Sequence, residues 1–179
     1  SAEGREQLGW EAWAAYGSDL DKAWLKTEGN RTGGTTEEAR VEALWNHVVA
    51  RWWSLQSGWR HDFGSQQVRD GRDWLAIGVQ GLAPGFFETE LTAYLRADRV
   101  ALRTSTEVDL RLTQRLVLQP TLDANAVSGA GATDAALGLR LRYELRREFA
   151  PYAGVRWAHH FEGATERELQ AVAGIRAWW

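Results

Sequence analysis

The segment Leu102–Leu112 constrains the fold more than any other part of the chain, because polar and apolar side chains alternate along it. Its odd positions are charged or polar from Arg103 to Arg111, and its even positions are leucine, valine or threonine. Successive side chains of a β-strand point to opposite faces, so this segment predicts a strand with one ionic face and one apolar face. Such a strand suits either a sheet with one face in water or a barrel in lipid that encloses its polar face.

The same alternation recurs along the chain, and turn residues interrupt it at the regular intervals that are typical of consecutive hairpins. We predict eleven strands: Leu8–Tyr16, Lys22–Gly29, Glu38–Val49, Trp53–Phe63, Trp74–Leu82, Phe87–Arg96, Arg99–Leu112, Leu116–Ala126, Ala136–Leu145, Tyr152–Phe161 and Leu169–Trp179. Most are close to the ~9–11 residues with which a tilted strand crosses a bilayer. The predicted fold class is therefore all-β, a single antiparallel up-and-down transmembrane β-barrel that takes in residues 1–179.

The number and connections of these strands carry two further expectations. Single-chain bacterial barrels have an even number of strands, so we expect one strand ahead of Ser1 and twelve in the parent protein. Ten strands is the alternative, if the first predicted strand is not one. Barrels of this kind keep short turns on the periplasmic side, which places the predicted loops 30–36, 64–72, 127–134 and 162–167 outside the cell.

The alternative to a membrane barrel is a soluble ligand-binding β-barrel, whose apolar face would point inward. The eleven tryptophans favour the membrane, because this residue concentrates at membrane–water interfaces. Aromatic residues also flank the predicted short turns, as Trp52, Trp53, Phe86 and Phe87 do, which is typical of a girdle. The last strand ends in Trp179 and so resembles the assembly signal of bacterial outer-membrane proteins.

Several classes of function lack support in the composition and motifs. The chain has no cysteine, which argues against disulfides and thiolate metal sites. Its net charge is −3 and it has no basic tract, so we expect no nucleic-acid partner. No hydrolase, zinc-protease, phosphate-loop or dinucleotide motif is present, and we therefore expect that the protein is not an enzyme.

Five blocks together resemble the outer-membrane copper-resistance protein B (CopB) family: Trp24–Gly29, Trp53–Phe63, Val79–Phe86, Leu112–Pro120 and Gly138–Gly154. The resemblance implies a multi-pass β-barrel in the outer membrane of a Gram-negative bacterium that acts in resistance to excess copper. It also implies contact with outer-membrane lipid, with copper ions and with a periplasmic copper protein. Members of this family often carry a periplasmic Met- and His-rich segment ahead of the barrel, and this chain, with no Met and four His, lacks one.

Copper favours imidazole ligands, and the best candidates in the sequence are His159, His160 and His61 near predicted external strand ends. Adjacent residues of a strand point to opposite faces, so His159 and His160 can share an ion only where the strand has frayed into a loop. The alternative is that these are interfacial or loop histidines without a ligand role. Copper is the only cofactor that the sequence suggests.

Charged side chains of both signs recur on the face that would line the interior of the barrel. This predicted ladder contains Glu28, Glu42, Glu88, Glu90, Arg103, Glu107, Asp109, Arg111, Arg140, Arg142, Glu144, Arg156 and Arg176. Its carboxylates could line a cation path, or the charges could pair across strands as internal bracing, which we favour because buried unpaired charges are costly. The predicted function is copper resistance by binding, sequestration or transport across the outer membrane. The alternative is an anchoring barrel whose copper chemistry lies in an N-terminal segment.

Overall fold

The computed structural model describes residues 7–32, 35–64, 73–129, 131–146, 148–161 and 166–177. The strands are β1 (Gln7–Gly17), β2 (Asp21–Thr32), β3 (Thr35–Ala50), β4 (Trp53–Gly64), β5 (Asp73–Ala83), β6 (Phe87–Leu95), β7 (Val100–Glu107), β8 (Leu110–Arg111), β9 (Leu116–Val127), β10 (Gly131–Tyr143), β11 (Phe149–His160) and β12 (Glu166–Ala177). They form an antiparallel up-and-down sheet, which confirms the predicted all-β class. No helix long and apolar enough to span a membrane occurs among the described residues.

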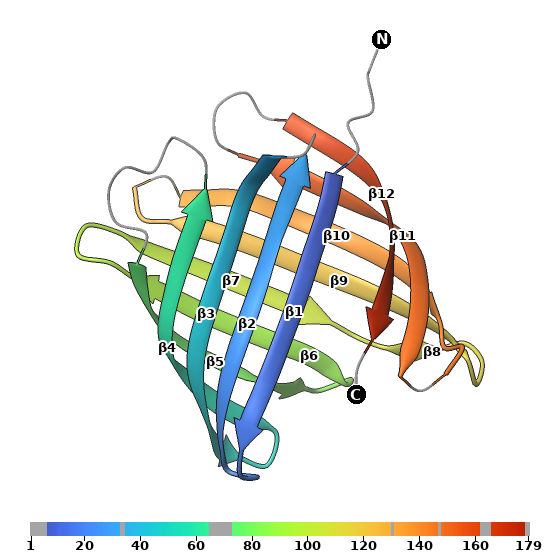
Figure 1. Ribbon diagram of the computed structural model, residues 1–179, viewed down its shortest axis with the longest axis horizontal. Helices are drawn as coiled ribbons and strands as arrows, with labels where there is room; N and C mark the ends of the chain where they lie inside the picture. Colours follow the sequence, from blue (N-terminus) through green and yellow to red (C-terminus); the bar gives the residue numbers. More distant parts are fainter. Residues whose placement is uncertain are drawn as a thin grey trace. The chain divides into compact units, whose positions relative to one another are not determined.

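The chain divides into two compact units, and each contains strands that are neighbours in sequence (Figure 1). The first unit takes in residues 1–79 and 93–100, and in it β1, β2, β3 and β4 pair in chain order. The second unit takes in residues 80–92 and 101–179, and in it β9 to β12 pair in the same way. Consecutive hairpins therefore account for the pairing within each unit.

The segment Arg99–Leu112, predicted as one strand, is two strands, which is why the described residues form twelve strands rather than eleven. Both β7 and β8 pair with β9, and the register is the same on either side of the break. Pro120 lies opposite the break, where it accepts a hydrogen bond from the Val108 N–H at 3.3 Å. Proline has no N–H to return that bond, so the ladder is interrupted at this point.

Two predicted loops are shorter in the structure, because the strands around them extend further. The predicted loop 30–36 belongs largely to the hairpin of β2 and β3, which pair as far as Thr32 and Thr35. The predicted loop 127–134 is mostly β10, which begins at Gly131 opposite Val127. A polar residue does not end a strand when its backbone can still pair with the opposite strand. Asn125 and Asp134 are polar, yet they are partners in the β9–β10 ladder and their side chains are hydrogen-bonded to each other. The positions Ser1, Trp178 and Trp179 and most of the predicted loops 64–72 and 162–167 lie outside the described residues.

Along most of the strands the apolar face is exposed and the polar face is buried or half-buried. Along β10, Leu137, Leu139 and Leu141 are exposed, while Arg142 is only 6% exposed. The other buried polar side chains are Glu42, Asn46, Gln56, Thr92 and Gln119. A soluble barrel would have the reverse arrangement, since water would cover the charges and the core would be apolar. The alternative of a soluble ligand-binding barrel is therefore wrong.

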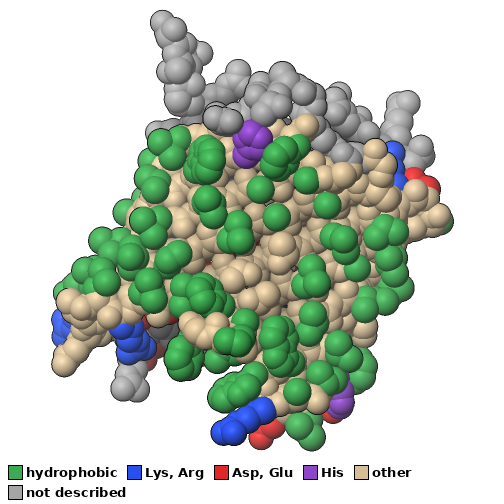
Figure 2. Space-filling model, turned by 180° about the vertical axis from the view of Figure 1, so that it is seen from behind, with side chains coloured by type: hydrophobic (Ala, Val, Ile, Leu, Met, Phe, Trp, Pro, Cys, Tyr) green, Lys and Arg blue, Asp and Glu red, His purple; other side chains and the backbone are tan. Residues whose placement is uncertain are grey.

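Figure 2 shows the same arrangement on one face of the molecule, where hydrophobic side chains are spread over the middle and charged ones lie near the edges. Aromatic side chains at strand ends are exposed as expected, among them Trp52 and Phe86. Val108 is an exception, because we expected it on the lipid face and it is only 7% exposed. It lies in the break between β7 and β8, where strict alternation does not hold.

Candidate functional site

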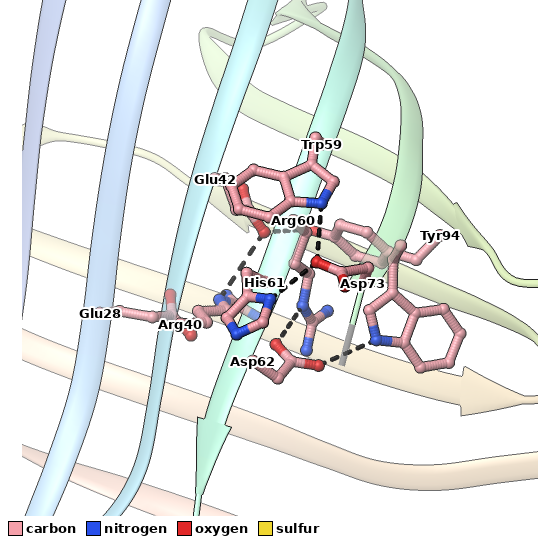
Figure 3. Close-up of polar contacts among 10 residues, drawn as sticks. Glu28, Arg40, Glu42, Trp59, Arg60, His61, Asp62, Asp73 and Tyr94 are labelled. Atoms are coloured by element: carbon pink, nitrogen blue, oxygen red, sulfur yellow. Dashed lines mark hydrogen bonds and ion pairs between the residues drawn. The ribbon is translucent and has the colours of Figure 1, made fainter. Parts of the chain in front are cut away.

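The inward-facing charges of the first unit form one continuous set of contacts (Figure 3). Arg40 on β3 pairs through Nη2 with Glu28, its direct partner on β2, and its Nε lies 3.7 Å from Oε1 of Glu42. Only 15% of the Arg40 side chain and 5% of the Glu42 side chain are exposed. Buried charges are tolerated only when they are paired, and here one guanidinium serves two carboxylates.

Tyr94 on β6 contacts the same carboxylate from another part of the sheet. Its hydroxyl donates a hydrogen bond of 2.8 Å to Oε1 of Glu42. The guanidinium carbon of Arg60 on β4 lies 4.4 Å from the centre of the Tyr94 ring, which is a cation–π distance. Glu42 therefore has both a cation and a hydroxyl donor, although it is almost completely buried.

The contacts continue from Arg60 toward the turn that follows β6. Arg60 donates through Nε to Asp62 at 2.6 Å, and Trp74 on β5 donates its indole N–H to the other oxygen of Asp62 at 3.0 Å. The guanidinium carbon of Arg96 lies 4.8 Å from the centre of the Trp74 ring. Arg96 also donates two hydrogen bonds, of 2.6 and 3.0 Å, to Asp98 in the turn, and these lower the pKa of Asp98 below its ordinary value.

His61 lies on the opposite, outward face of β4, between Trp59 and Phe63. Its Nδ1 lies 2.7 Å from Oδ1 of Asp73 on β5, and the Trp59 indole N–H donates to the same oxygen at 2.9 Å. The His61 ring also packs edge-on against Phe63, with ring centres 4.5 Å apart. A carboxylate that accepts a hydrogen bond from Nδ1 orients the imidazole, so that Nε2 is the ring nitrogen that can bind a metal ion. This arrangement is found at many metal-binding histidines.

His47 has the same arrangement on β3. Its Nδ1 lies 2.8 Å from Oδ1 of Asp21, which also accepts the Trp45 indole N–H at 3.1 Å. His47 precedes the short turn between β3 and β4, whereas His61 lies near the other end of β4. A Trp-x-His pair on one strand with an aspartate on a neighbouring strand is therefore a recurrent unit of the outward face.

The other two predicted ligands lie at the end of β11. His159 packs edge-on against Phe161 with ring centres 4.4 Å apart, and His160 is exposed opposite Asp134. Within the described part of the chain, no group of three His, Cys, Asp or Glu side chains is placed to hold a metal ion. The copper-binding role of His61, His159 and His160 stays a prediction.

In the second unit, Asp109 is the centre of the inward-facing contacts. It accepts hydrogen bonds of 2.6 Å from Arg142 and 3.0 Å from Gln119. Nη2 of Arg142 also lies 3.5 Å from Glu144. Asp109 lies in the break opposite Pro120, and interruptions of a ladder often redirect a side chain in this way.

The remaining members of the predicted ladder differ in exposure. Arg140 is half-buried and lies over the Tyr152 ring at 5.6 Å. The half-buried members are Glu90, Arg103, Glu107, Arg140, Glu144 and Arg156, and the exposed ones are Glu88, Arg111 and Arg176. Half-buried charges of both signs are therefore present in the second unit.

Sequence reasoning missed Tyr94, Trp74 and Asp62 as members of the interior. The signal for Tyr94 was present, because it follows Glu90 and Thr92 at every second position and so shares their face. No signal within one strand could show that Tyr94 would contact Glu42, since that contact joins strands that are not neighbours.

The exposed apolar face and the buried ionic face define the class of protein, which is an outer-membrane type of β-barrel. Solved structures agree with this class. The superposition on the KdgM porin has a TM-score of 0.62 at 13% identity and covers 98% of this chain and 96% of the porin. The superposition on the NanC porin has a TM-score of 0.64 at 12% identity and covers 97% of this chain and 98% of the porin. At such low identity these likenesses concern the fold alone.

The family is defined by sequence. The profile described as "Copper resistance protein B precursor (CopB)" matches residues 1–179. "Copper resistance protein B" of Escherichia coli is 40% identical over 99% of the chain, and "Copper resistance protein B homolog" of Pseudomonas syringae pv. tomato is 36% identical over 96%. The chain belongs to the copper resistance protein B family, as the resemblance predicted. It spans 65% and 64% of the length of these two relatives.

Proposed function

We propose that this chain is the membrane-spanning barrel of a copper resistance protein in the outer membrane of a Gram-negative bacterium. Membership of the copper resistance protein B family carries the proposal, and the inverted arrangement of the two faces supports the location. Apolar side chains such as Leu137 and Leu139 suit contact with lipid, and the buried charges suit an enclosed interior. The protein acts without catalysing a reaction.

The carboxylates of the interior suit a route or a holding place for copper ions. Glu28, Glu42 and Asp62 supply oxygen donors in the first unit, and Asp109 supplies them in the second. All four carboxylates are already engaged by arginine, which stabilises the barrel. Copper would compete with those arginines, so weak and reversible occupation fits the interior better than permanent storage.

His61 is the best placed first contact for copper on the outward face. Asp73 accepts from Nδ1 and Trp59 and Phe63 pack on either side, so Nε2 is the atom left to bind a copper ion. His159 and His160 would serve in the same way at the end of β11. Copper that enters the periplasm, or leaves it, would be exchanged with a periplasmic copper protein.

The test is copper tolerance in a strain from which the parent gene has been deleted. The full-length gene, the barrel alone and a full-length triple variant His61→Ala, His159→Ala and His160→Ala are returned separately. We expect the barrel to restore part of the tolerance, and the triple variant to restore less than the unaltered full-length gene. Deletion without loss of tolerance would refute the proposal. Tolerance from the full-length protein and none from the folded barrel would assign the copper chemistry to the rest of the protein.

A further inference from the structure

The hydrogen bond between Tyr94 and Glu42 joins two strands that are not neighbours in the sheet. Glu42 lies on β3 and Tyr94 on β6, with β4 and β5 between them. Neighbouring strands lie about 4.8 Å apart, so three spacings amount to about 14 Å along the sheet. A contact of 2.8 Å is possible only because the inward face curves around the two side chains. Both residues belong to the first unit, so the contact lies entirely within it.

The crossing side chains are held by charges on both sides. Arg40 ties Glu42 to Glu28 on β2, and Arg60 lies over the ring of Tyr94 while it pairs with Asp62 (Figure 3). The Tyr94 side chain therefore has a fixed hydroxyl partner and a fixed cation on its ring. A side chain with both contacts loses most of its rotamer freedom, which suits an element that must stay in one position.

Other polar side chains of the first unit are buried as well. Gln56 is 2% exposed and Asn46 is 6% exposed, and Asn46 is the direct partner of Gln56 in the β3–β4 register. β5, which lies between β4 and β6, has Ala76 and Gly78 buried on the same face. These small residues leave the room in which the side chains of Tyr94 and Arg60 meet.

We propose that the Tyr94–Glu42 contact narrows the barrel interior from the side of the first unit and that Tyr94 limits the passage of ions. The proposal rests on the proposed function only in so far as the interior is a route across the membrane. The ring of Tyr94 supplies the steric part of the barrier, and its hydrogen bond to Glu42 holds the ring in place. Glu42 and Arg60 present opposite charges at this level, so ions that pass must displace a paired group.

The experiment measures the conductance of the purified barrel in planar lipid bilayers bathed in potassium chloride. The variants are Tyr94→Ala, which removes the ring, and Tyr94→Phe, which keeps the ring and removes the hydroxyl. Tyr143→Ala is the matched control, because Tyr143 is a tyrosine on the exposed face with 43% of its surface accessible. Heat-modifiable migration on a gel verifies that each variant is folded.

We expect a several-fold rise in conductance for Tyr94→Ala, a smaller rise with more frequent openings for Tyr94→Phe, and no change for Tyr143→Ala. A conductance of Tyr94→Ala equal to that of the control would overturn the proposal. If Tyr94→Ala does not fold, Tyr94→Phe decides in the same way, because a wild-type conductance and opening frequency would refute the proposed role of the hydrogen bond.

The current is carried by potassium and chloride, so it does not depend on copper. A raised conductance together with unchanged copper tolerance on gene deletion would leave the constriction in place and refute the proposed function. A copper-sensitive deletion strain together with an unchanged conductance of Tyr94→Ala would support the proposed function and refute the constriction.

Discussion

A charge placed on the outward face should be costly in the middle of a strand and almost harmless at its end. Leu137 and Tyr143 on β10 test this, because they are 49% and 43% exposed and differ mainly in depth. Leu137 is the seventh of the thirteen residues of the strand, and Tyr143 is the last. The register partners of Leu137 are Leu122 and Trp157, which are also exposed, so its surroundings are apolar on both sides.

The magnitude follows from the depth. Six residues at about 3.4 Å each, on a strand tilted by about 40°, place Leu137 about 15 Å below the level of Tyr143. At the bilayer midplane an arginine on the lipid face costs about 2–4 kcal/mol, and near the interface about 0–1 kcal/mol. We therefore expect Leu137→Arg to lower the free energy of unfolding by about 2–4 kcal/mol and Tyr143→Arg by less than about 1 kcal/mol.

The assay is reversible urea unfolding of each variant in lipid vesicles, followed by tryptophan fluorescence. On a water-exposed surface the two substitutions would each change stability by no more than about 0.5 kcal/mol, because their exposures are nearly equal. Equal and small effects at the two positions would therefore refute the assignment of this face to lipid. The measurement is made in vesicles because the expected difference depends on the depths of positions 137 and 143 in a lipid bilayer, which detergent does not preserve.

Three further outcomes follow from local geometry. Gly58→Ala should destabilise the barrel by about 1–3 kcal/mol in the same assay, because a Cβ there would clash with the backbone of β3, and wild-type stability would contradict this. The lowered pKa of Asp98 means that its contacts with Arg96 stabilise the fold above the ordinary pKa of 3.8 and are lost as the pH falls through the lower folded value. The melting temperature of the wild type should therefore exceed that of Asp98→Asn at pH 6 and approach it below about pH 4; a gap that grows on acidification has the wrong sign. A double-mutant cycle of Tyr94→Phe and Glu42→Gln should give a coupling of about 1.5–3 kcal/mol, as for hydrogen bonds to charged groups, and additive effects would contradict the contact.

The alternation of side chains was enough to predict most strands and the face of most residues. Leu137, Leu139 and Leu141 are exposed and Arg142 is buried because the period of two is a local property of the extended backbone. The connection predicted between the strands that end at Leu82 and begin at Phe87 is also present as a turn, in which Gly85 adopts a positive φ of 88° that favours glycine. These features depend on neighbouring residues alone.

The break between β7 and β8 could not be predicted from the strand that contains it. Leu102–Leu112 alternates throughout, and the interruption comes from Pro120 on the next strand, which lacks the N–H that the ladder needs. That break is where Val108 becomes buried and Asp109 contacts Arg142. The predicted loop lengths were wrong for a similar reason, because a strand ends where pairing ends and not where the composition becomes polar.

The sequence by itself determined that the chain is a β-sheet with one ionic and one apolar face, because that pattern needs only the geometry of single strands. It also determined the copper resistance protein B family, through blocks spread along the chain. Only the tertiary structure decided which charges meet. Glu42 contacts Tyr94 across two intervening strands, and His61 meets Asp73 twelve residues away on β5. Such contacts depend on register and curvature, which bring together residues that no spacing along one strand can connect.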